Sequence, residues 1–145
     1  MTGHRFERMV RQVFEAFISR LGFTMAPLSI SGRVYSVHFT SSTHVVSVSY
    51  EPGDEQVLVT VSPVAQNLLS DYDDRARTPR LGDLNARYMK LVTDEERLAN
   101  HAAFSSIVAD DKEELRLLKS LRELCLVLPR YLRDAGSQGP MPGAL

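Results

Sequence analysis

The densest group of side chains that could bind a metal ion is an acidic cluster formed by Asp71, Asp73 and Asp74. Carboxylate oxygens are the ligands that Mg²⁺ and Ca²⁺ prefer in proteins. A calcium-binding loop starting at Asp71 would need an acidic or amide ligand at its fifth position and a glutamate at its twelfth, where this chain has Arg75 and Gly82. Neighbouring arginines would also repel a cation, so the cluster predicts a solvated or salt-linked loop instead of a metal site.

The histidines and the one cysteine show no spacing typical of a zinc site or of a nucleophile beside a base. His38 and His44 could approach each other across a turn if both point from the outer face of adjacent strands, but nothing nearby supplies the two further ligands that zinc needs. We expect the histidines to lie at the surface. Cys125 lies among leucines, which would desolvate its thiol and raise the thiol pKa, so we expect it to be buried and unreactive.

Motifs of familiar enzyme classes are absent from the sequence. There is no glycine-rich phosphate loop, no Gly-x-Ser-x-Gly elbow and no His-Glu-x-x-His pair. The sequence therefore predicts a protein that is not an enzyme and that carries no cofactor. One possible ligand-binding or catalytic surface stays open, the hydroxyl-rich face of a predicted sheet, with Ser36, His38, Ser47, Ser49 and Thr60.

The composition is that of a globular domain, with 145 residues, 43% hydrophobic residues, and 17 Lys and Arg against 18 Asp and Glu. We expect one domain over residues 1–135 and a disordered tail over 136–145, which is rich in Gly and Pro. A single cysteine fits a reducing compartment, and no uncharged run approaches the length of a spanning helix. These features predict a cytoplasmic protein without a membrane segment.

Three segments between Gly32 and Ser62 each alternate apolar and polar residues, and they are the main elements that could position a site. The ranges 34–40, 44–50 and 56–62 each place valine or aromatic residues on one face and mostly hydroxyl residues on the other. They predict an antiparallel meander, to which residues 23–31 add at most an edge strand because Pro27 lacks an N–H donor. The fold class is therefore α+β with a three- to four-stranded sheet.

Helices are predicted both before and after the meander along the chain. Apolar residues recur at helical spacing from Phe6 to Leu21, and Gly22 stands where a helix would stop. The C-terminal half is predicted to be helical, and its first helix covers about 82–92. A capping box at Thr93 and Glu96 starts a second helix, with Leu98, Ala102 and residues 104–108 on its apolar side, and a last helix follows Asp110 and Asp111. The last helix has a predicted apolar face of Leu115, Leu118, Leu121, Leu124 or Cys125, and Leu128, and Pro129 should kink or end it.

The first helix is expected to cover the valine face of the meander. The leucine-rich last helix then has two possible places, because two helices cannot both sit centrally on three strands. Either it packs at the side and beyond the sheet edge, or it covers the second face of the sheet near Val45 and Leu58.

Charge is distributed unevenly along the C-terminal half. Residues 93–114 carry a net charge of −5, and residues 115–134 carry a net charge of +3. Nucleic-acid binding favours one broad basic face, so this dipolar pattern instead favours a charged protein partner.

The order of these elements resembles that of small bacterial α+β immunity proteins, which are encoded beside toxins. The resemblance covers about the first 62 residues and consists of the helix stop Leu21-Gly22-Phe23, the segment Arg33-Val34-Tyr35-Ser36 and the run Val46 to Asp54. It implies a non-catalytic protein whose exposed acidic or aromatic surface binds and blocks a protein partner. By that resemblance the partner-binding residues would be Asp71, Tyr72, Asp73, Asp74, Asp94, Glu95, Asp110, Asp111 and Glu114.

The arrangement of a helix, a meander and further helices also looks like that of bacterial secretion chaperones. That likeness implies a homodimer that escorts a protein partner, whereas an immunity-type or adaptor protein forms a one-to-one complex. Both hypotheses place function in protein binding, without nucleic acid or membrane.

Overall fold

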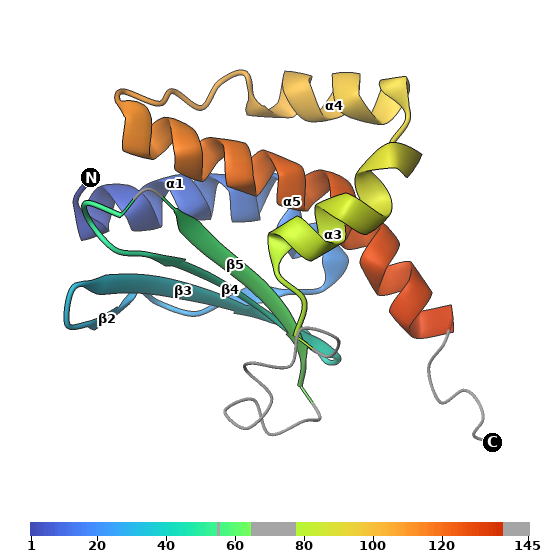
Figure 1. Ribbon diagram of the computed structural model, residues 1–145, viewed down its shortest axis with the longest axis horizontal. Helices are drawn as coiled ribbons and strands as arrows, with labels where there is room; N and C mark the ends of the chain where they lie inside the picture. The colour runs from blue at the N-terminus through green and yellow to red at the C-terminus, as the bar shows by residue number, and fades with distance from the viewer. Residues whose placement is uncertain (55, 65–77, 138–145) are drawn as a thin grey trace.

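The fold is seen in a computed structural model that describes residues 1–54, 56–64 and 78–137. It contains an N-terminal helix, an antiparallel sheet and further helices in the C-terminal half, as Figure 1 shows. The predicted α+β class is confirmed.

The first helix, α1 (Gly3–Ala16), starts at Thr2, whose hydroxyl oxygen accepts a hydrogen bond from the Arg5 N–H at 3.1 Å. Its buried stripe follows the predicted spacing. The α-helix ends earlier than predicted, and a 3₁₀ turn, η1 (Ile18–Leu21), replaces its last turn. This tighter turn keeps Ile18 in the core, and Gly22 ends it in the left-handed conformation (φ 86°) as expected.

The sheet follows the predicted meander. Its three long strands are β3 (Val34–Thr40), β4 (His44–Tyr50) and β5 (Val57–Pro63), in antiparallel register with Val48 opposite both Val37 and Val59. The edge on the β3 side consists of two short strands, β1 (Thr24–Met25) and β2 (Ser29–Ser31), which both pair with β3. Pro27 lies between them and has no N–H to donate, which explains why the edge is divided.

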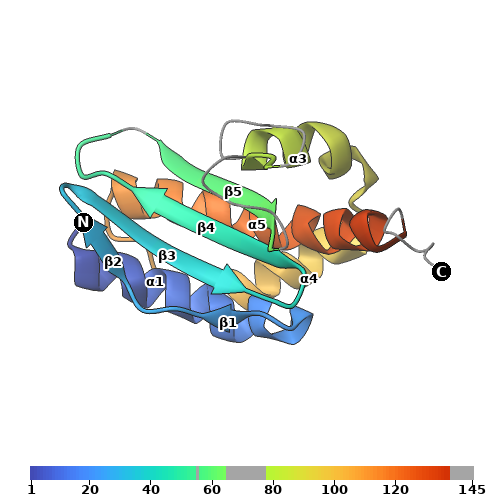
Figure 2. The same cartoon turned by 90° about the horizontal axis from the view of Figure 1, so that it is seen from below.

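Both long helices pack on the same face of the sheet. α1 contacts β3, α5 (Lys112–Ser137) contacts β5, and the two helices contact each other. Figure 2 shows the strands in front with α1 and α5 behind them. The alternative in which the last helix covers the second face is therefore wrong, and no described helix covers that face.

In the described part of the connection between β5 and α5, residues 78–111, three elements occur. These are α3 (Leu81–Tyr88), η2 (Met89–Leu91) and α4 (Asp94–Phe104). The predicted capping box of α4 is present: the Glu96 N–H donates to Thr93 Oγ1 at 3.1 Å, and the Thr93 N–H donates to Glu96 Oε1 at 3.2 Å. The predicted apolar side of α4 is confirmed at Phe104, which is 4% exposed. It is wrong at Leu98, which is 70% exposed, and at Ala102, which is also exposed, and the helix buries the polar Asn100.

The last helix, α5, forms the centre of the core with its inner face. Leu115 was expected on that face but is 57% exposed, whereas Leu117 and Val127 are fully buried. The helix continues through Pro129, although the proline ring removes the hydrogen bond to the Cys125 carbonyl. Its last turns have tertiary anchors that compensate: the Tyr88 hydroxyl donates to Asp134 Oδ2 at 2.8 Å, and other residues of these turns pack on the core.

The predicted tail boundary lies two residues too early. Residues 136 and 137 belong to α5, which buries its preceding turns against the core. Residues 138–145 and the predicted acidic loop around Asp71 lie outside the described residues.

Candidate functional site

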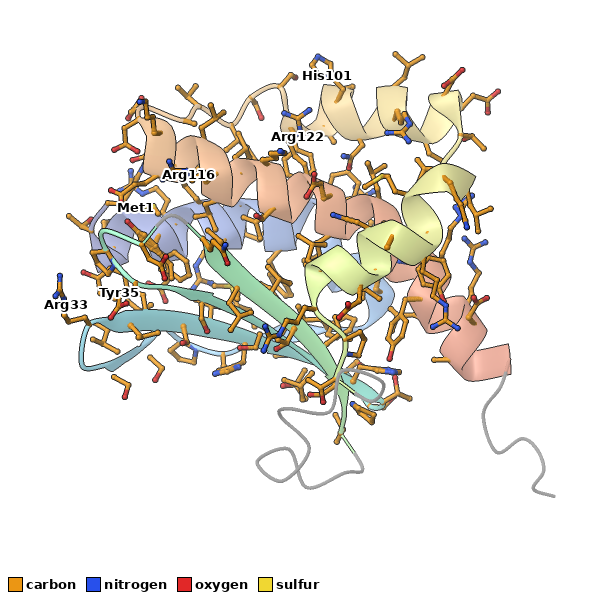
Figure 3. All side chains as sticks on the ribbon, viewed as in Figure 1. Met1, Arg33, Tyr35, His101, Arg116 and Arg122 are labelled. Atoms are coloured by element: carbon orange, nitrogen blue, oxygen red, sulfur yellow. The ribbon has the colours of Figure 1, made fainter. Side chains whose placement is uncertain are left out.

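The outer face of α5 carries a line of charged residues directly opposite its buried leucines. Arg116, Lys119 and Glu123 recur at intervals of three or four residues, so they share one side of the helix, and the apolar Leu126 continues the same row. Arg122 flanks this line on the side that faces α4, as Figure 3 shows. Because the inner face of α5 is fixed in the core, the charged line has a rigid support.

One hollow of about 350 Å³ lies between η2, α4 and α5. Its lining contains three cationic side chains, one carboxylate, one amide and two apolar residues. They are Arg97, Lys119, Arg122, Glu123, Asn100, Met89 and Leu126.

A second hollow of about 260 Å³ lies nearer the start of α5. It is bounded by Gln56 and Val57 at the start of β5 and by Arg116 and Ser120 on α5. Lys119 and Glu123 line both hollows, so the two adjoin. We call the pair together the α5 groove.

The cations of the α5 groove are not neutralised by ion pairs. In the described part of the chain, Arg97, Arg116, Lys119 and Arg122 form no salt bridge, in contrast to Arg5 and Arg130. The Arg97 guanidinium donates to the Met89 carbonyl at 3.2 Å, which holds it over the groove. Glu123 accepts a hydrogen bond from the Asn85 amide at 3.2 Å, which ties the one groove carboxylate to α3.

Asn100 is a buried polar residue in the wall of the larger hollow, with 5% of its surface exposed. Its Nδ2 donates to the Arg122 carbonyl at 3.2 Å. Its Oδ1 is buried and has no hydrogen-bond partner among the described residues. An unsatisfied buried acceptor typically costs about 1–3 kcal/mol of folding stability, so this oxygen destabilises the wall of the hollow locally.

The predicted acidic residues that the structure describes do not form one surface. Asp94 and Glu95 lie exposed in the first turn of α4, and Asp110 lies beyond the other end of that helix. Asp111 caps α5, since its Oδ1 accepts from the Glu114 N–H at 2.9 Å. Of the predicted partner-binding residues, Asp71, Tyr72, Asp73 and Asp74 fall outside the described residues.

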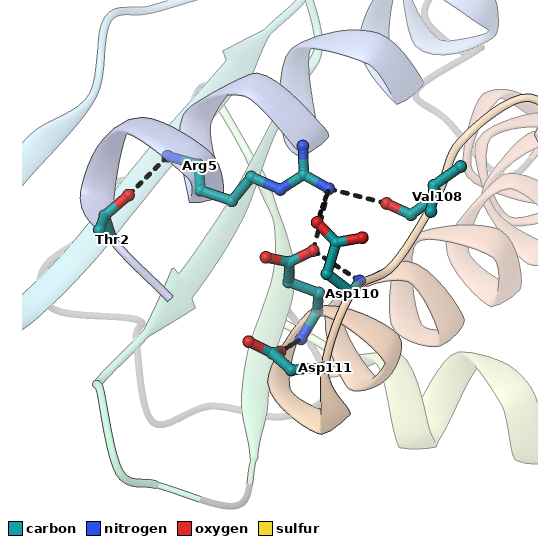
Figure 4. A network of polar contacts seen from close by, with 6 residues as sticks. Thr2, Arg5, Val108, Asp110 and Asp111 are labelled. Atoms are coloured by element: carbon teal, nitrogen blue, oxygen red, sulfur yellow. Dashed lines mark hydrogen bonds and ion pairs between the residues drawn. The ribbon is translucent and has the colours of Figure 1, made fainter.

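Glu114 is buried in an ion pair and cannot contribute to an exposed acidic surface. Arg5 Nη2 donates to Glu114 Oε1 at 2.9 Å and to the Val108 carbonyl at 2.8 Å, as Figure 4 shows. The Asp110 N–H donates to the same Glu114 oxygen at 2.9 Å. The hydrogen bond from Arg5 is the main cause that lowers the pKa of Glu114.

The hydroxyl-rich sheet face keeps its predicted composition. Ser36 pairs with Ser49 across the strands, with their hydroxyl oxygens 3.0 Å apart, and His38 stands opposite Ser47. No hydrogen bond joins His38 to Ser47 within the described residues, so the His38 imidazole is not held against the Ser47 hydroxyl.

The prediction that His44 lies at the surface is wrong. It has the same strand parity as the inward valines of β4, so it lies buried against the Tyr131 ring with 5.6 Å between ring centroids. His38 has the opposite parity, and the two histidines therefore lie on different faces and cannot share a metal ion. Burial lowers the pKa of His44.

Cys125 matches its prediction, because it is a free, buried thiol whose pKa burial raises to about 12. Among the described residues, no three His, Cys, Asp or Glu side chains gather in a way that could hold a metal ion. None of the described helices has an apolar stretch sufficient to span a lipid bilayer.

The sequence contains one signal for the α5 groove, the positive charge of residues 115–134. The groove itself escaped prediction because its walls come from β5, η2 and α4, whose approach to α5 depends on the tertiary fold. Comparisons of the chain with family models, curated proteins and solved structures found no match.

Proposed function

We propose that this protein is a non-catalytic protein-binding module, of the adaptor or immunity type, that holds an acidic segment of a partner in the α5 groove. The observation that carries the proposal is a set of four cations, Arg97, Arg116, Lys119 and Arg122, which line two adjoining hollows and form no salt bridge with any described residue. Electrostatic complementarity of this kind selects partners and speeds their association.

The size of the groove suits a short extended peptide. Arg116 and Arg122 are six residues apart, which corresponds to about 9 Å along a helix. An extended chain covers that distance with about three residues. A segment with two or three acidic residues would therefore place its carboxylates along the line of cations.

The proposed binding surface is basic, whereas the resemblance to immunity proteins implies an acidic or aromatic one. Asp111 and Glu114 act within the fold as a cap and an ion-pair partner. Among the described residues, the groove cations are therefore the stronger electrostatic feature. The groove is short and includes Glu123, so it is less suited to the long phosphate backbone of a nucleic acid. In this proposal the protein works in the cytoplasm, without a cofactor or a membrane.

A second candidate function is that of a dimeric escort protein resembling secretion chaperones. One observation favours it, namely that no described helix covers the hydroxyl-rich face of the sheet. Light scattering tests this candidate, because a dimer would have twice the monomer mass of 16.3 kDa. A monomer at micromolar concentration would eliminate it.

The test of the main proposal is affinity capture from a lysate of the native host with three immobilised proteins. They are the wild type, the double variant R116E/K119E and the matched control R20E/R33E, which changes the same charge at two exposed arginines outside the groove. We expect the wild type and the control to retain one specific protein that R116E/K119E loses. Equal recovery by all three proteins, or recovery of no specific protein, would contradict the proposal.

A further inference from the structure

The larger hollow of the α5 groove carries more positive charge than a single carboxylate would neutralise. Arg97 enters it from α4, and Lys119 and Arg122 enter it from α5. Glu123 is the one carboxylate in the lining, so the formal net charge of the hollow is +2. A concave wall reduces the access of water, which strengthens the attraction for an anion.

The donors in this hollow are available for a ligand. The Arg97 guanidinium uses Nη2 for the Met89 carbonyl and retains other N–H groups, because an arginine has five. Lys119 and Arg122 make no ion pair with the residues that the structure describes. Two guanidinium groups and an ammonium group are the side chains that proteins use to hold phosphate.

The charge of the hollow matches a dianion. A phosphate monoester carries a charge of about −1.5 to −2 near pH 7 and presents three acceptor oxygens. A carboxylate carries one negative charge and would leave the hollow with an excess positive charge. We propose that the hollow lined by Arg97, Lys119 and Arg122 binds a phosphate monoester.

The apolar residues indicate what accompanies the phosphate. Met89 and Leu126 give the hollow an apolar wall beside its cations. A phosphorylated side chain fits this lining, since the peptide that carries it can supply apolar neighbours.

This inference rests on the proposed function in one respect, because it places the phosphate on the partner segment that the α5 groove holds. Small phosphate compounds offer the same chemistry without the peptide. The experiment must therefore separate a phosphorylated peptide from a free phosphate compound, and both from an ordinary acidic peptide.

The experiment measures the fluorescence anisotropy of three labelled acidic peptides that differ at one central residue, which is phosphoserine, glutamate or serine. Free O-phosphoserine serves as a competitor. The proteins are the wild type, R97Q/R122Q and the matched control R20Q/R33Q, with circular dichroism to verify that each is folded. These substitutions leave the Arg122 carbonyl that Asn100 contacts in place.

We expect the phosphoserine peptide to bind the wild type and the control about tenfold more tightly than the glutamate peptide, a difference of about 1.4 kcal/mol. The preference should disappear in R97Q/R122Q. Competition by O-phosphoserine at a similar concentration to the phosphopeptide would support the site and identify a small compound as its ligand.

Equal affinity for phosphoserine and glutamate peptides would overturn this inference while leaving the proposed function intact. A phosphoserine preference that persists in R97Q/R122Q would also overturn it. Absence of binding by all three peptides and by O-phosphoserine would count against both proposals.

Discussion

Arg5 on α1 and Glu114 on α5 form an ion pair at 2.9 Å that joins the two helices covering the sheet. Glu114 is 5% exposed, and it also accepts the Asp110 N–H where the chain enters α5. The pair therefore fixes the start of α5 relative to α1. Since α5 supplies one wall of the α5 groove, this contact helps to position the groove cations.

Replacing Glu114 by glutamine should destabilise the protein. The substitution keeps the side-chain shape but leaves the Arg5 guanidinium with only the more distant, exposed Asp110 carboxylate at 3.6 Å as an anion. We therefore expect a loss of about 1–3 kcal/mol in the free energy of unfolding. Urea denaturation measures this loss. The matched control E95Q changes an exposed carboxylate and should stay within about 0.5 kcal/mol of the wild type.

The same pair gives a pH dependence with a defined sign. Because the pKa of Glu114 is lowered in the folded state, its contribution is complete above the pKa of an ordinary glutamate, about 4.3, and is lost as the pH falls through the folded-state value. The difference between wild type and E114Q should therefore shrink in acid. A difference that is constant from pH 7 to pH 3 would show that charge is not its cause.

His44 should make stability fall between pH 7 and pH 5. Its pKa is lowered by burial, so the unfolded chain takes up a proton below about pH 6.5 that the folded chain resists. The variant H44Q removes this titration and should show a flatter dependence of the urea midpoint on pH. The control H101Q alters an exposed histidine on α4 and should keep the wild-type slope; an unchanged slope in H44Q would refute the assignment.

Cys125 should resist thiol reagents in the folded protein. Burial raises its pKa to about 12, so almost no thiolate exists at pH 8. We expect Ellman's reagent to react only as the protein unfolds, with a rate that increases with urea. Rapid reaction in the absence of denaturant would show that the inner face of α5 opens readily.

Arg130 should hold α4 against α5. Its two terminal nitrogens donate to the two Glu96 oxygens at 3.1 and 2.8 Å, and α4 buries few side chains of its own. Lysine cannot form this paired contact, so R130K should lower stability by about 0.5–1 kcal/mol and reduce the amide-exchange protection of α4. Unchanged protection would mean that Phe104 and Asn100 suffice to fix the helix.

Much of the fold followed from local patterns in the sequence. The alternation of valines in 34–40 and 44–50 predicted both strands to the residue, and the capping box at Thr93 predicted the start of α4. These features succeed because they depend on neighbouring residues alone. They also determine which face of the sheet is apolar, and hence where helices can pack.

Features that depend on distant contacts were missed. Leu98 and Leu115 are apolar residues at plausible helical positions, yet they lie outside the narrow faces that α4 and α5 bury. Glu114 looked like a surface carboxylate because its partner, Arg5, lies 109 residues earlier in the chain. The α5 groove was missed for the same reason, since no local pattern brings Arg97 to Arg122.

The most direct measurement of the central claim is a nuclear magnetic resonance titration of isotope-labelled protein with a short peptide containing three glutamates. Our account predicts saturable shifts of backbone amides around Arg116, Lys119, Arg122 and Arg97, and loss of these shifts in R116E/K119E but not in R20E/R33E. Shifts that instead gather on the hydroxyl-rich sheet face, or that never saturate, would contradict the assignment of the α5 groove as the partner-binding surface.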